Sequence, residues 1–373
     1  MILGIPFLIA GTAGIYVAGK MPSKEQEEAS NTYTELFKNM GILRENEWVK
    51  LVKTKRNKAY NVFSFKIADS VAVDRFKENE VFIAEKIYAK DEFTNRLKIY
   101  YDDGMMHFRI IHATIEPEVF KPLKPPTCDS LLVGHDLDYL PIWSDDVNLF
   151  VTGVTGAGKS TILHCIIINL LYWHQAKLYM GDLKGTEFYE YRNKKNVYKV
   201  VDSLDSLDAL ITEFIEEYKA RIKLLREGEI QYKNYKEYNK CHKDKMAPYA
   251  LVIDEFADFA YRWIKKGDPY GLYLDLISIC AKIRCTGGRV ILGTQRPSVD
   301  VVKGVLKNNF NFVGMRMINS TNSRIVIDED GLEDLEKYRA KIRQDGKLVD
   351  VIAYKLTEEA IREHTKSLKD KRE

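Results

Sequence analysis

Runs of consecutive apolar residues alternate with segments of helical apolar spacing from residue 147 to the end of the chain. We expect strands at 147–152, 177–181, 249–253, 289–293, 311–317 and 348–354. Short apolar runs of this kind are typical of strands that are buried on both faces, and long helical connections such as 206–227 are what parallel strands require. The pattern therefore predicts an α/β domain whose mostly parallel sheet is covered by helices on both faces.

A different pattern precedes this domain. Residues 61–67 alternate between apolar and polar as in a half-buried strand, and residues 73–88 have helical apolar spacing. Two further strand patterns, at 97–101 and 107–115, flank Asp102-Asp103-Gly104, which is a hairpin signal. We therefore expect a small α+β subdomain at 30–120. A proline-rich stretch at 121–126 separates it from the α/β domain, which we assign to 121–355, with a charged helical tail at 356–373.

The first nineteen residues carry no charged side chain and are followed by Lys20 and Lys24. As a helix they would span roughly 28 Å, close to the thickness of a hydrocarbon core. We predict a single transmembrane anchor at 1–19, joined by a polar connector at 20–29. The flanking lysines favour a cytoplasmic location for everything that follows. The alternatives are a segment buried in the fold or a processed leader.

Composition narrows the functional classes. The chain has 373 residues and a formal charge of only +3, so any surface for a polyanion must come from local placement of charge. The five cysteines contain no CxxC pair, and the seven histidines show no metal-ligand spacing. We therefore expect a reducing environment and no structural zinc.

One segment carries a specific chemical signal. Residues 153–160, GVTGAGKS, match the phosphate-loop pattern GxxxxGK[ST], and they lie between a predicted strand and an apolar helix. In such a loop the backbone N–H groups surround the phosphates of a nucleotide, Lys159 reaches the β- and γ-phosphates, and Ser160 binds Mg²⁺. We predict ATP and Mg²⁺ as ligands; a purely structural glycine-rich turn is the alternative. The residues that we assign to ATP binding are Gly153, Val154, Thr155, Gly156, Ala157, Gly158, Lys159, Ser160 and Thr161.

Two later strands end in residues that complete an ATPase site. Asp254 and Glu255 follow the strand at 249–253, and Gln295 follows the strand at 289–293. An aspartate at this position accepts from the Mg²⁺ shell, a neighbouring glutamate polarises the attacking water, and Gln295 would sense the γ-phosphate. Alternatively, the carboxylates cap a surface turn and the glutamine is an ordinary loop residue.

These motifs and their surroundings resemble the motor domain of the FtsK/SpoIIIE family of double-stranded DNA translocases, which belongs to the FtsK/HerA group of ring ATPases. The likeness covers about residues 130–350. It is most specific in Val252-Ile253-Asp254-Glu255-Phe256-Ala257-Asp258 and in Gly293-Thr294-Gln295-Arg296-Pro297. Two further segments are similar to family elements, Gly181-Asp182-Leu183-Lys184, in which a leucine replaces the family's proline, and Ser323-Arg324-Ile325-Val326.

The resemblance implies a RecA-like motor that assembles as a ring, expected to be a hexamer. Arg284 matches the position of the family's arginine finger, which acts on the nucleotide of the neighbouring subunit. Arg296 and Arg324 match loop positions that contact the phosphate backbone of DNA without reading its sequence.

A single predicted anchor ahead of one motor resembles the coupling ATPases of Gram-positive conjugative plasmids and integrative elements. This layout implies DNA transfer at the cell membrane, with a relaxase or secretion-channel components as further partners. A translocase for chromosome or plasmid segregation is an alternative. The same motifs would also suit a type VII protein-secretion ATPase or a non-catalytic nucleotide-binding scaffold.

Overall fold

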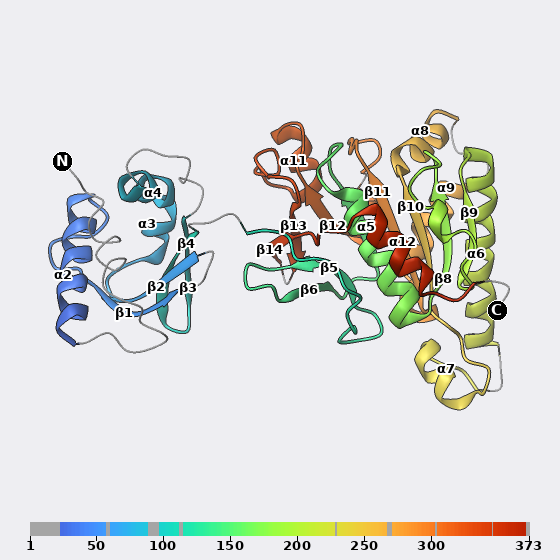
Figure 1. Cartoon of the computed structure of the whole chain (residues 1–373), viewed down its shortest axis with the longest axis horizontal. Helices are drawn as coiled ribbons and strands as arrows, with labels where there is room; N and C mark the ends of the chain where they lie inside the picture. Colours follow the sequence, from blue (N-terminus) through green and yellow to red (C-terminus); the bar gives the residue numbers. More distant parts are fainter. Residues whose placement is uncertain are drawn as a thin grey trace. The chain divides into compact units, whose positions relative to one another are not determined.

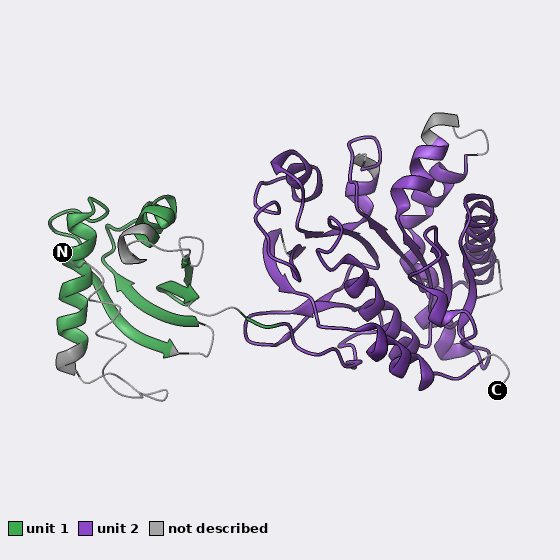
Figure 2. Ribbon diagram, turned by 45° about the horizontal axis from the view of Figure 1, so that its top comes forward, with its two compact units in different colours: residues 1–116 green, residues 117–373 purple. Residues whose placement is uncertain are grey.

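The computed structural model describes residues 23–56, 60–88, 97–111, 115–227, 230–266, 271–302, 304–344 and 346–370. The chain forms two compact units, unit 1 at residues 1–116 and unit 2 at 117–373 (Figure 2). The anchor predicted at 1–19 lies outside the described residues. None of the described helices is long and apolar enough to cross a bilayer.

Unit 1 is a four-stranded antiparallel sheet with helices packed on one face (Figure 1). The strand order is β1-β2-β4-β3. The predicted strand at 61–67 and the predicted hairpin are confirmed, whereas the helical segment predicted at 73–88 is two helices that meet at Asn79. The elements are α2 (Ser23–Asn39), β1 (Val49–Arg56), β2 (Tyr60–Ile67), α3 (Val73–Glu78), α4 (Glu80–Tyr88), β3 (Leu97–Asp102) and β4 (Met105–Ile111).

The β1 edge of the unit 1 sheet is covered by α2. Gln26, Ser30 and Thr34 lie four residues apart and therefore share one side of the helix. The Gln26 amide donates to the Leu51 carbonyl at 2.6 Å, Ser30 Oγ accepts from the Leu51 N–H at 3.0 Å, and Thr34 Oγ1 donates to the Val49 carbonyl at 3.0 Å. These bonds satisfy backbone groups of β1 that another strand could otherwise pair with.

Unit 2 contains a ten-stranded sheet in the order β6-β5-β14-β13-β12-β7-β11-β10-β8-β9. The six strands from β12 to β9 are parallel, which confirms the mostly parallel sheet, and the other four extend it by antiparallel pairing. The strands are β5 (Leu131–His135), β6 (Pro141–Ser144), β7 (Asn148–Thr152), β8 (Lys177–Asp182), β9 (Val197–Val201), β10 (Tyr249–Asp254), β11 (Gly288–Thr294), β12 (Asn311–Met315), β13 (Arg339–Gln344) and β14 (Lys347–Ile352).

The last predicted strand, at 348–354, differs from the expected parallel arrangement. It forms an antiparallel hairpin with β13, because Gly346 takes a left-handed φ of 77° and reverses the chain between the two strands. The structure adds β5, β6, β9 and β13, which the apolar pattern does not predict.

Helices cover both faces of this sheet (Figure 1). Successive residues of β7 enter different cores: Leu149 and Val151 pack with α5 and α12, whereas Phe150 packs with α6, α8 and α9. The centres of β8, β10 and β11 are apolar, and these strands end in the polar residues Asp182, Asp254 and Thr294. The helices are α5 (Lys159–Asn169), extended by a π-helical turn (Leu170–His174), α6 (Leu204–Arg226), α7 (Tyr235–Cys241), α8 (Phe256–Lys266), α9 (Leu272–Cys280), α10 (Gly304–Asn309), α11 (Ser320–Ile327) and α12 (Glu358–Lys366).

Candidate nucleotide site

The predicted phosphate loop connects the end of β7 to the start of α5. Gly156 and Gly158 have φ values of 80° and 114°, a region that residues with a Cβ rarely adopt. A Cβ on Gly153 would lie 2.8 Å from the Met315 Cβ, so glycine also permits close packing against β12. The loop has the backbone shape that its glycines predict.

A cavity of about 220 Å³ lies beside this loop. Its lining joins the loop to two other parts of unit 2, the end of β11 and the residues just before β13. Tyr338 is fixed there because its backbone N–H donates to the Ala157 carbonyl at 2.9 Å. No signal in the sequence predicted this segment. The lining residues are Val154, Thr155, Gly156, Gly158, Lys159, Ser160, Thr161, Gln295, Lys337 and Tyr338.

Lys159 and Asp254 form a buried ion pair behind the cavity. Their side chains are 3% and 1% exposed, and the Lys159 ammonium donates to Asp254 Oδ1. A Cβ on Gly293 would lie 3.1 Å from Asp254 Oδ1 and 3.4 Å from Lys159 Nζ, so the glycine leaves room for the pair. The second carboxylate oxygen, Oδ2, is buried and accepts no hydrogen bond from the residues that the structure describes.

Glu255 lies beside this pair in a restrained conformation. Its backbone φ is 57°, and its carboxylate Oε1 accepts from Thr294 Oγ1 at 2.8 Å and from the Gln295 N–H at 3.0 Å. The Gln295 side chain in turn accepts from Thr155 Oγ1 at 3.1 Å. The structure therefore brings together the predicted residues Lys159, Asp254, Glu255 and Gln295.

A lysine to which the sequence assigned no role completes this charge cluster. Lys184, just after β8, lies 3.6 Å from Glu255 Oε2 and 3.9 Å from Asp254 Oδ2. The turn that carries it is held by the fully buried Asp182, which accepts from the N–H groups of three following residues at 2.8 to 3.0 Å. Asp182 pairs in register with Asp254 on the adjacent strand. The family resemblance singles out the segment from Gly181 to Lys184, but without a role for Lys184 in the site.

The first turn of α5 faces a second carboxylate. Glu187 Oε2 lies 3.6 Å from His164 Nε2, and this contact, with smaller contributions from Ser160 and Lys159, lowers the pKa of Glu187. His164 Nδ1 lies 2.8 Å from the Tyr191 hydroxyl. Glu187 therefore remains ionised beside the residues that begin α5.

The site has donors suited to Mg²⁺. Ser160 lines the cavity, and Asp254 offers a buried carboxylate oxygen that accepts no hydrogen bond within the described part of the chain. Across the described ranges, no group of three His, Cys, Asp or Glu side chains could hold a metal ion. A magnesium ion here would therefore depend on Ser160, Asp254 and the phosphate oxygens of a nucleotide, which it readily uses as ligands.

Arg284 does not lie at this cavity. It is part of a 3₁₀ turn at Ile283–Thr286 that precedes β11, whereas Gln295 follows β11. The seven residues of β11 span roughly 20 Å, so the two positions lie at opposite edges of the sheet. The Arg284 guanidinium donates to the Asp145 carbonyl and lies 3.9 Å from Asp129 Oδ2.

Arg296 and Arg324 are exposed on neighbouring segments. A cavity of about 420 Å³ is shared by the segment after Arg296 and by α11, and its lining includes Val299, Val302 and Arg324. Arg324 forms an ion pair of 2.7 Å with Asp330. The structure therefore places the two predicted DNA-contacting segments side by side.

Comparison with known proteins identifies related chains. The sequence profile of the FtsK/SpoIIIE family matches residues 130–348. DNA translocase FtsK of Helicobacter pylori strain J99 is 27% identical over 303 residues, which are 76% of this chain and 35% of that protein. DNA translocase FtsK of Campylobacter jejuni serotype O:2 is 30% identical over 242 residues, which are 60% of this chain and 24% of that protein. The chain thus spans about a quarter to a third of these relatives.

Solved structures share the fold. The pCW3 conjugation coupling protein TcpA, in a monomer form with ATPγS, superposes with a TM-score of 0.57 at 24% identity and covers 89% of this chain and 95% of its own. The cytoplasmic domain of the type VII secretion ATPase EccC of Thermomonospora curvata has a TM-score of 0.55 at 18% identity and covers 68% of this chain and 33% of its own.

Proposed function

The chain belongs to the FtsK/SpoIIIE family, and on that premise we propose that it is an ATP-driven DNA translocase with a RecA-like motor in unit 2. One observation carries the proposal. The phosphate loop, the Lys159–Asp254 pair, Glu255 and Gln295 meet at the carboxyl edge of the parallel sheet in the arrangement that hydrolysis of a nucleoside triphosphate requires.

Each residue has a role in this reaction. The loop backbone and Lys159 bind the phosphates of ATP, and the phosphates compete with Asp254 for the lysine ammonium. Ser160 and Asp254 would hold Mg²⁺, which when bound would neutralise charge on the phosphate oxygens. Glu255 accepts a proton from the water that attacks the γ-phosphorus, and the bond to the leaving ADP oxygen breaks. Gln295 responds to the presence of the γ-phosphate through its contact with the loop.

The position of Arg284 supports a ring. An arginine at the opposite edge of the sheet from the cavity cannot reach its own nucleotide, but it is available to the nucleotide of an adjacent subunit. We propose a hexamer in which Arg284 stabilises charge on the γ-phosphoryl group of the neighbour. Asp129 and the Asp145 carbonyl hold the guanidinium in place.

Double-stranded DNA is the proposed cargo, since relatives that are 27% and 30% identical are DNA translocases. Arg296 and Arg324 would contact its phosphates, which predicts weak sequence preference and steep salt dependence. By analogy with the fold of TcpA, the process is transfer of conjugative plasmid or integrative-element DNA, with a relaxase or channel components as partners. Residues 1–19 would anchor the protein in the cell membrane with the motor in the cytoplasm.

A second candidate is a protein-secretion motor, because the fold is also that of the type VII ATPase EccC. The two candidates differ in what stimulates hydrolysis. Duplex DNA should raise the turnover of a DNA translocase, whereas a peptide cargo should raise that of a secretion motor.

The test measures phosphate release by the full chain with linear duplex DNA, with peptide and with neither. Arg284→Ala and Glu255→Gln are then assayed separately and mixed. In a shared site each variant lacks what the other supplies, so the mixture should recover part of the wild-type rate. Glu255→Gln is chosen because it leaves the buried Lys159–Asp254 pair intact.

Arg192→Ala is the matched control, since Arg192 is also an exposed arginine, 45% exposed, and neither Arg192 nor its partner Asp202 lines the cavity. It should retain the wild-type rate. If DNA does not stimulate hydrolysis, the translocase proposal is wrong. If the mixture recovers no activity while both variants are folded, action of Arg284 in a neighbouring subunit is wrong.

A further inference from the structure

The sheet of unit 1 has two faces of opposite character. One face contributes Val49, Phe65 and Phe108 to an apolar core that includes residues of α2, α3 and α4. Side chains at the alternate positions point to the other face. Among these, Lys50, Lys53, Lys55, Lys66 and Lys98 are exposed, and His107 and Arg109 are partly exposed.

Cations on this second face stand directly opposite one another. Lys50 of β1 pairs in register with Lys66 of β2, and Lys98 of β3 pairs with Arg109 of β4. Like charges in directly opposed positions destabilise a sheet. Among the described residues Lys50, Lys53 and Lys66 make no ion pair, and Lys98 lies 4.0 Å from Glu80. These opposed cations do not stabilise the fold, so their arrangement calls for another explanation.

Arg109 at the centre of the face is held rigidly. Its guanidinium lies 5.1 Å from the ring centre of Tyr60 and 5.4 Å from that of Tyr100. The Tyr100 ring stacks on His107 at 4.9 Å, and His107 Nδ1 lies 2.9 Å from Ser64 Oγ. None of the residues that the structure describes accepts a hydrogen bond from the Arg109 Nε–H. That N–H is buried and not open to a ligand, but the two rings orient the guanidinium of the partly exposed Arg109 on this face before any ligand binds.

We propose that this face, which we call the basic face (Lys50, Lys53, Lys55, Lys66, Lys98 and Arg109), binds the phosphate backbone of duplex DNA. The inference rests on the proposed DNA substrate and adds a contact surface outside unit 2. The four strands present cations across roughly 14 Å. A polyanion that lies over this face would reduce the electrostatic repulsion between the opposed lysines. Contacts to the phosphate backbone of DNA add affinity without sequence preference.

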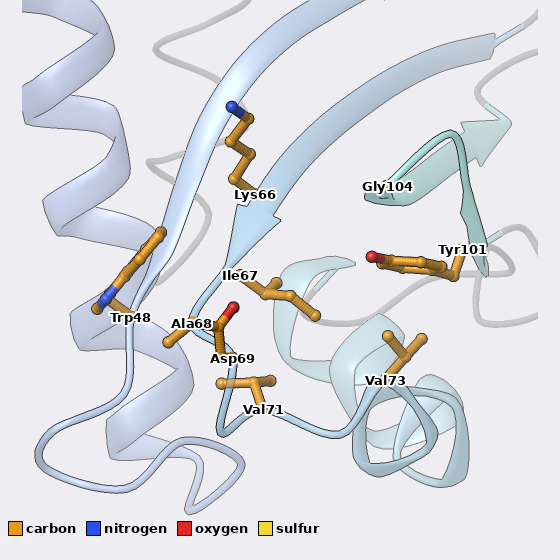
Figure 3. Close-up of a pocket in the computed structure, with 9 residues that line it drawn as sticks. All are labelled: Trp48, Lys66, Ile67, Ala68, Asp69, Val71, Val73, Tyr101 and Gly104. Carbon is orange, nitrogen blue, oxygen red and sulfur yellow. The ribbon is translucent and has the colours of Figure 1, made fainter.

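The pocket at one end of the sheet is less suited to DNA than the basic face. Figure 3 shows Lys66 at this pocket of about 680 Å³, with Trp48 and Tyr101 on its two sides. The Asp69 carboxylate and several apolar side chains also line it, and a carboxylate repels phosphate. An anionic membrane is a weaker candidate for the basic face, because Val62 at its centre is buried and the exposed Trp48 lies at one end of the face, at the pocket that Asp69 also lines.

Lysine footprinting on the full chain tests the proposal. Acetylation of each lysine is measured by mass spectrometry with and without duplex DNA. Lys50, Lys53, Lys66 and Lys98 should lose reactivity when DNA is added and regain it at high salt. Lys38 and Lys77 of the same unit, which lie on helices, should not change. Protection should persist in Arg296→Ala/Arg324→Ala, because the basic face is a separate contact.

Affinity measurements supply the second readout. Lys53→Gln/Lys66→Gln should reduce the slope of log affinity against log salt by roughly 2, one unit for each lost phosphate contact. Lys38→Gln/Lys77→Gln removes the same charge from the same unit and should leave the slope unchanged.

The outcomes separate this inference from the proposed function. If the wild-type chain does not bind duplex DNA at all, the proposed function fails. If it binds DNA but the basic-face lysines stay reactive and the slope is unchanged, only this inference fails. Protection by phosphatidylserine vesicles without protection by DNA would also overturn it, since the occupant would then be a membrane.

Discussion

The two sheets of this protein leave different surfaces open for chemistry. The ten-stranded sheet of unit 2 is covered on both faces, so its functional side chains lie where the parallel strands end. The four-stranded sheet of unit 1 packs its helices on one face, and its cations lie across the other. The first arrangement suits a small ligand that is enclosed and cleaved; the second suits a long polymer that is held. Substitutions in unit 2 should therefore change the rate of ATP hydrolysis, and substitutions in unit 1 should change the affinity for DNA.

The largest effect is expected from Glu255→Gln at the carboxyl edge of the unit 2 sheet. The amide cannot accept the proton of the attacking water, so hydrolysis should fall by about 10² to 10⁴-fold. Thr294 and the Gln295 N–H can still bond to the remaining carbonyl oxygen, so the fold should persist. Steady-state phosphate release measures the loss of hydrolysis, and nucleotide binding checks that the fold persists. Full turnover in this variant would favour the non-catalytic scaffold.

The buried ion pair at the same edge should contribute to stability as well as to catalysis. Lys159→Met leaves Asp254 buried without its main partner and should lower the free energy of unfolding by about 3 kcal/mol. Lys159→Met/Asp254→Leu removes both charges and should recover most of that loss without recovering hydrolysis. Hydrogen exchange of β7 and β10 in urea measures the stability. Equal destabilisation of the single and double variants would show that the pair acts through packing and not through charge.

Much of unit 2 could be predicted because burial on both faces leaves a strong sequence signal. Each predicted strand from 147–152 to 311–317 contains at least three consecutive residues that are apolar or glycine, and such runs have few alternatives inside a domain. The strands that were missed are short or polar. The hairpin of β13 and β14 still carried a signal, the Asp-Gly pair at 345–346.

The residues of the candidate site also divide into those that the sequence predicts and those that it does not. Lys159 could be predicted from the phosphate-loop motif. Asp254, Glu255 and Gln295 could be predicted because they lie at or just after the ends of strands, and parallel strands end at one edge. Lys184 and Tyr338 reach the site from loops whose paths depend on tertiary packing, such as the bond from the Tyr338 N–H to the phosphate loop. The sequence marks the segment from Gly181 to Lys184 by its family resemblance but does not specify where the Lys184 side chain lies, and it carries no signal for Tyr338.

Burial beneath the unit 2 sheet should also make stability depend on pH. His174 ends the π-helical turn after α5, and burial together with the nearby Arg289 charge lowers its pKa to about 4. In the unfolded chain the value is about 6.5. The unfolded state therefore binds the proton first, and stability should fall as pH drops from 6.5 to 4, by about 3 kcal/mol in total. His174→Gln should lose this part of the pH dependence in thermal unfolding, whereas the exposed His242→Gln should keep it.

The smallest effect concerns the open face of unit 1, where Lys66→Glu should place a carboxylate directly opposite Lys50. An opposed pair of unlike charges replaces a repulsive one, so β1 and β2 should become more stable by roughly 0.5 kcal/mol, while protection of Lys50 by DNA declines. Hydrogen exchange of the two strands measures the first effect. Lys50→Glu/Lys66→Glu restores repulsion with the opposite sign and should cancel the gain. If Lys66→Glu instead loosens these strands, the lysines serve folding, and the contrast between an enclosed catalytic edge and an open binding face is lost.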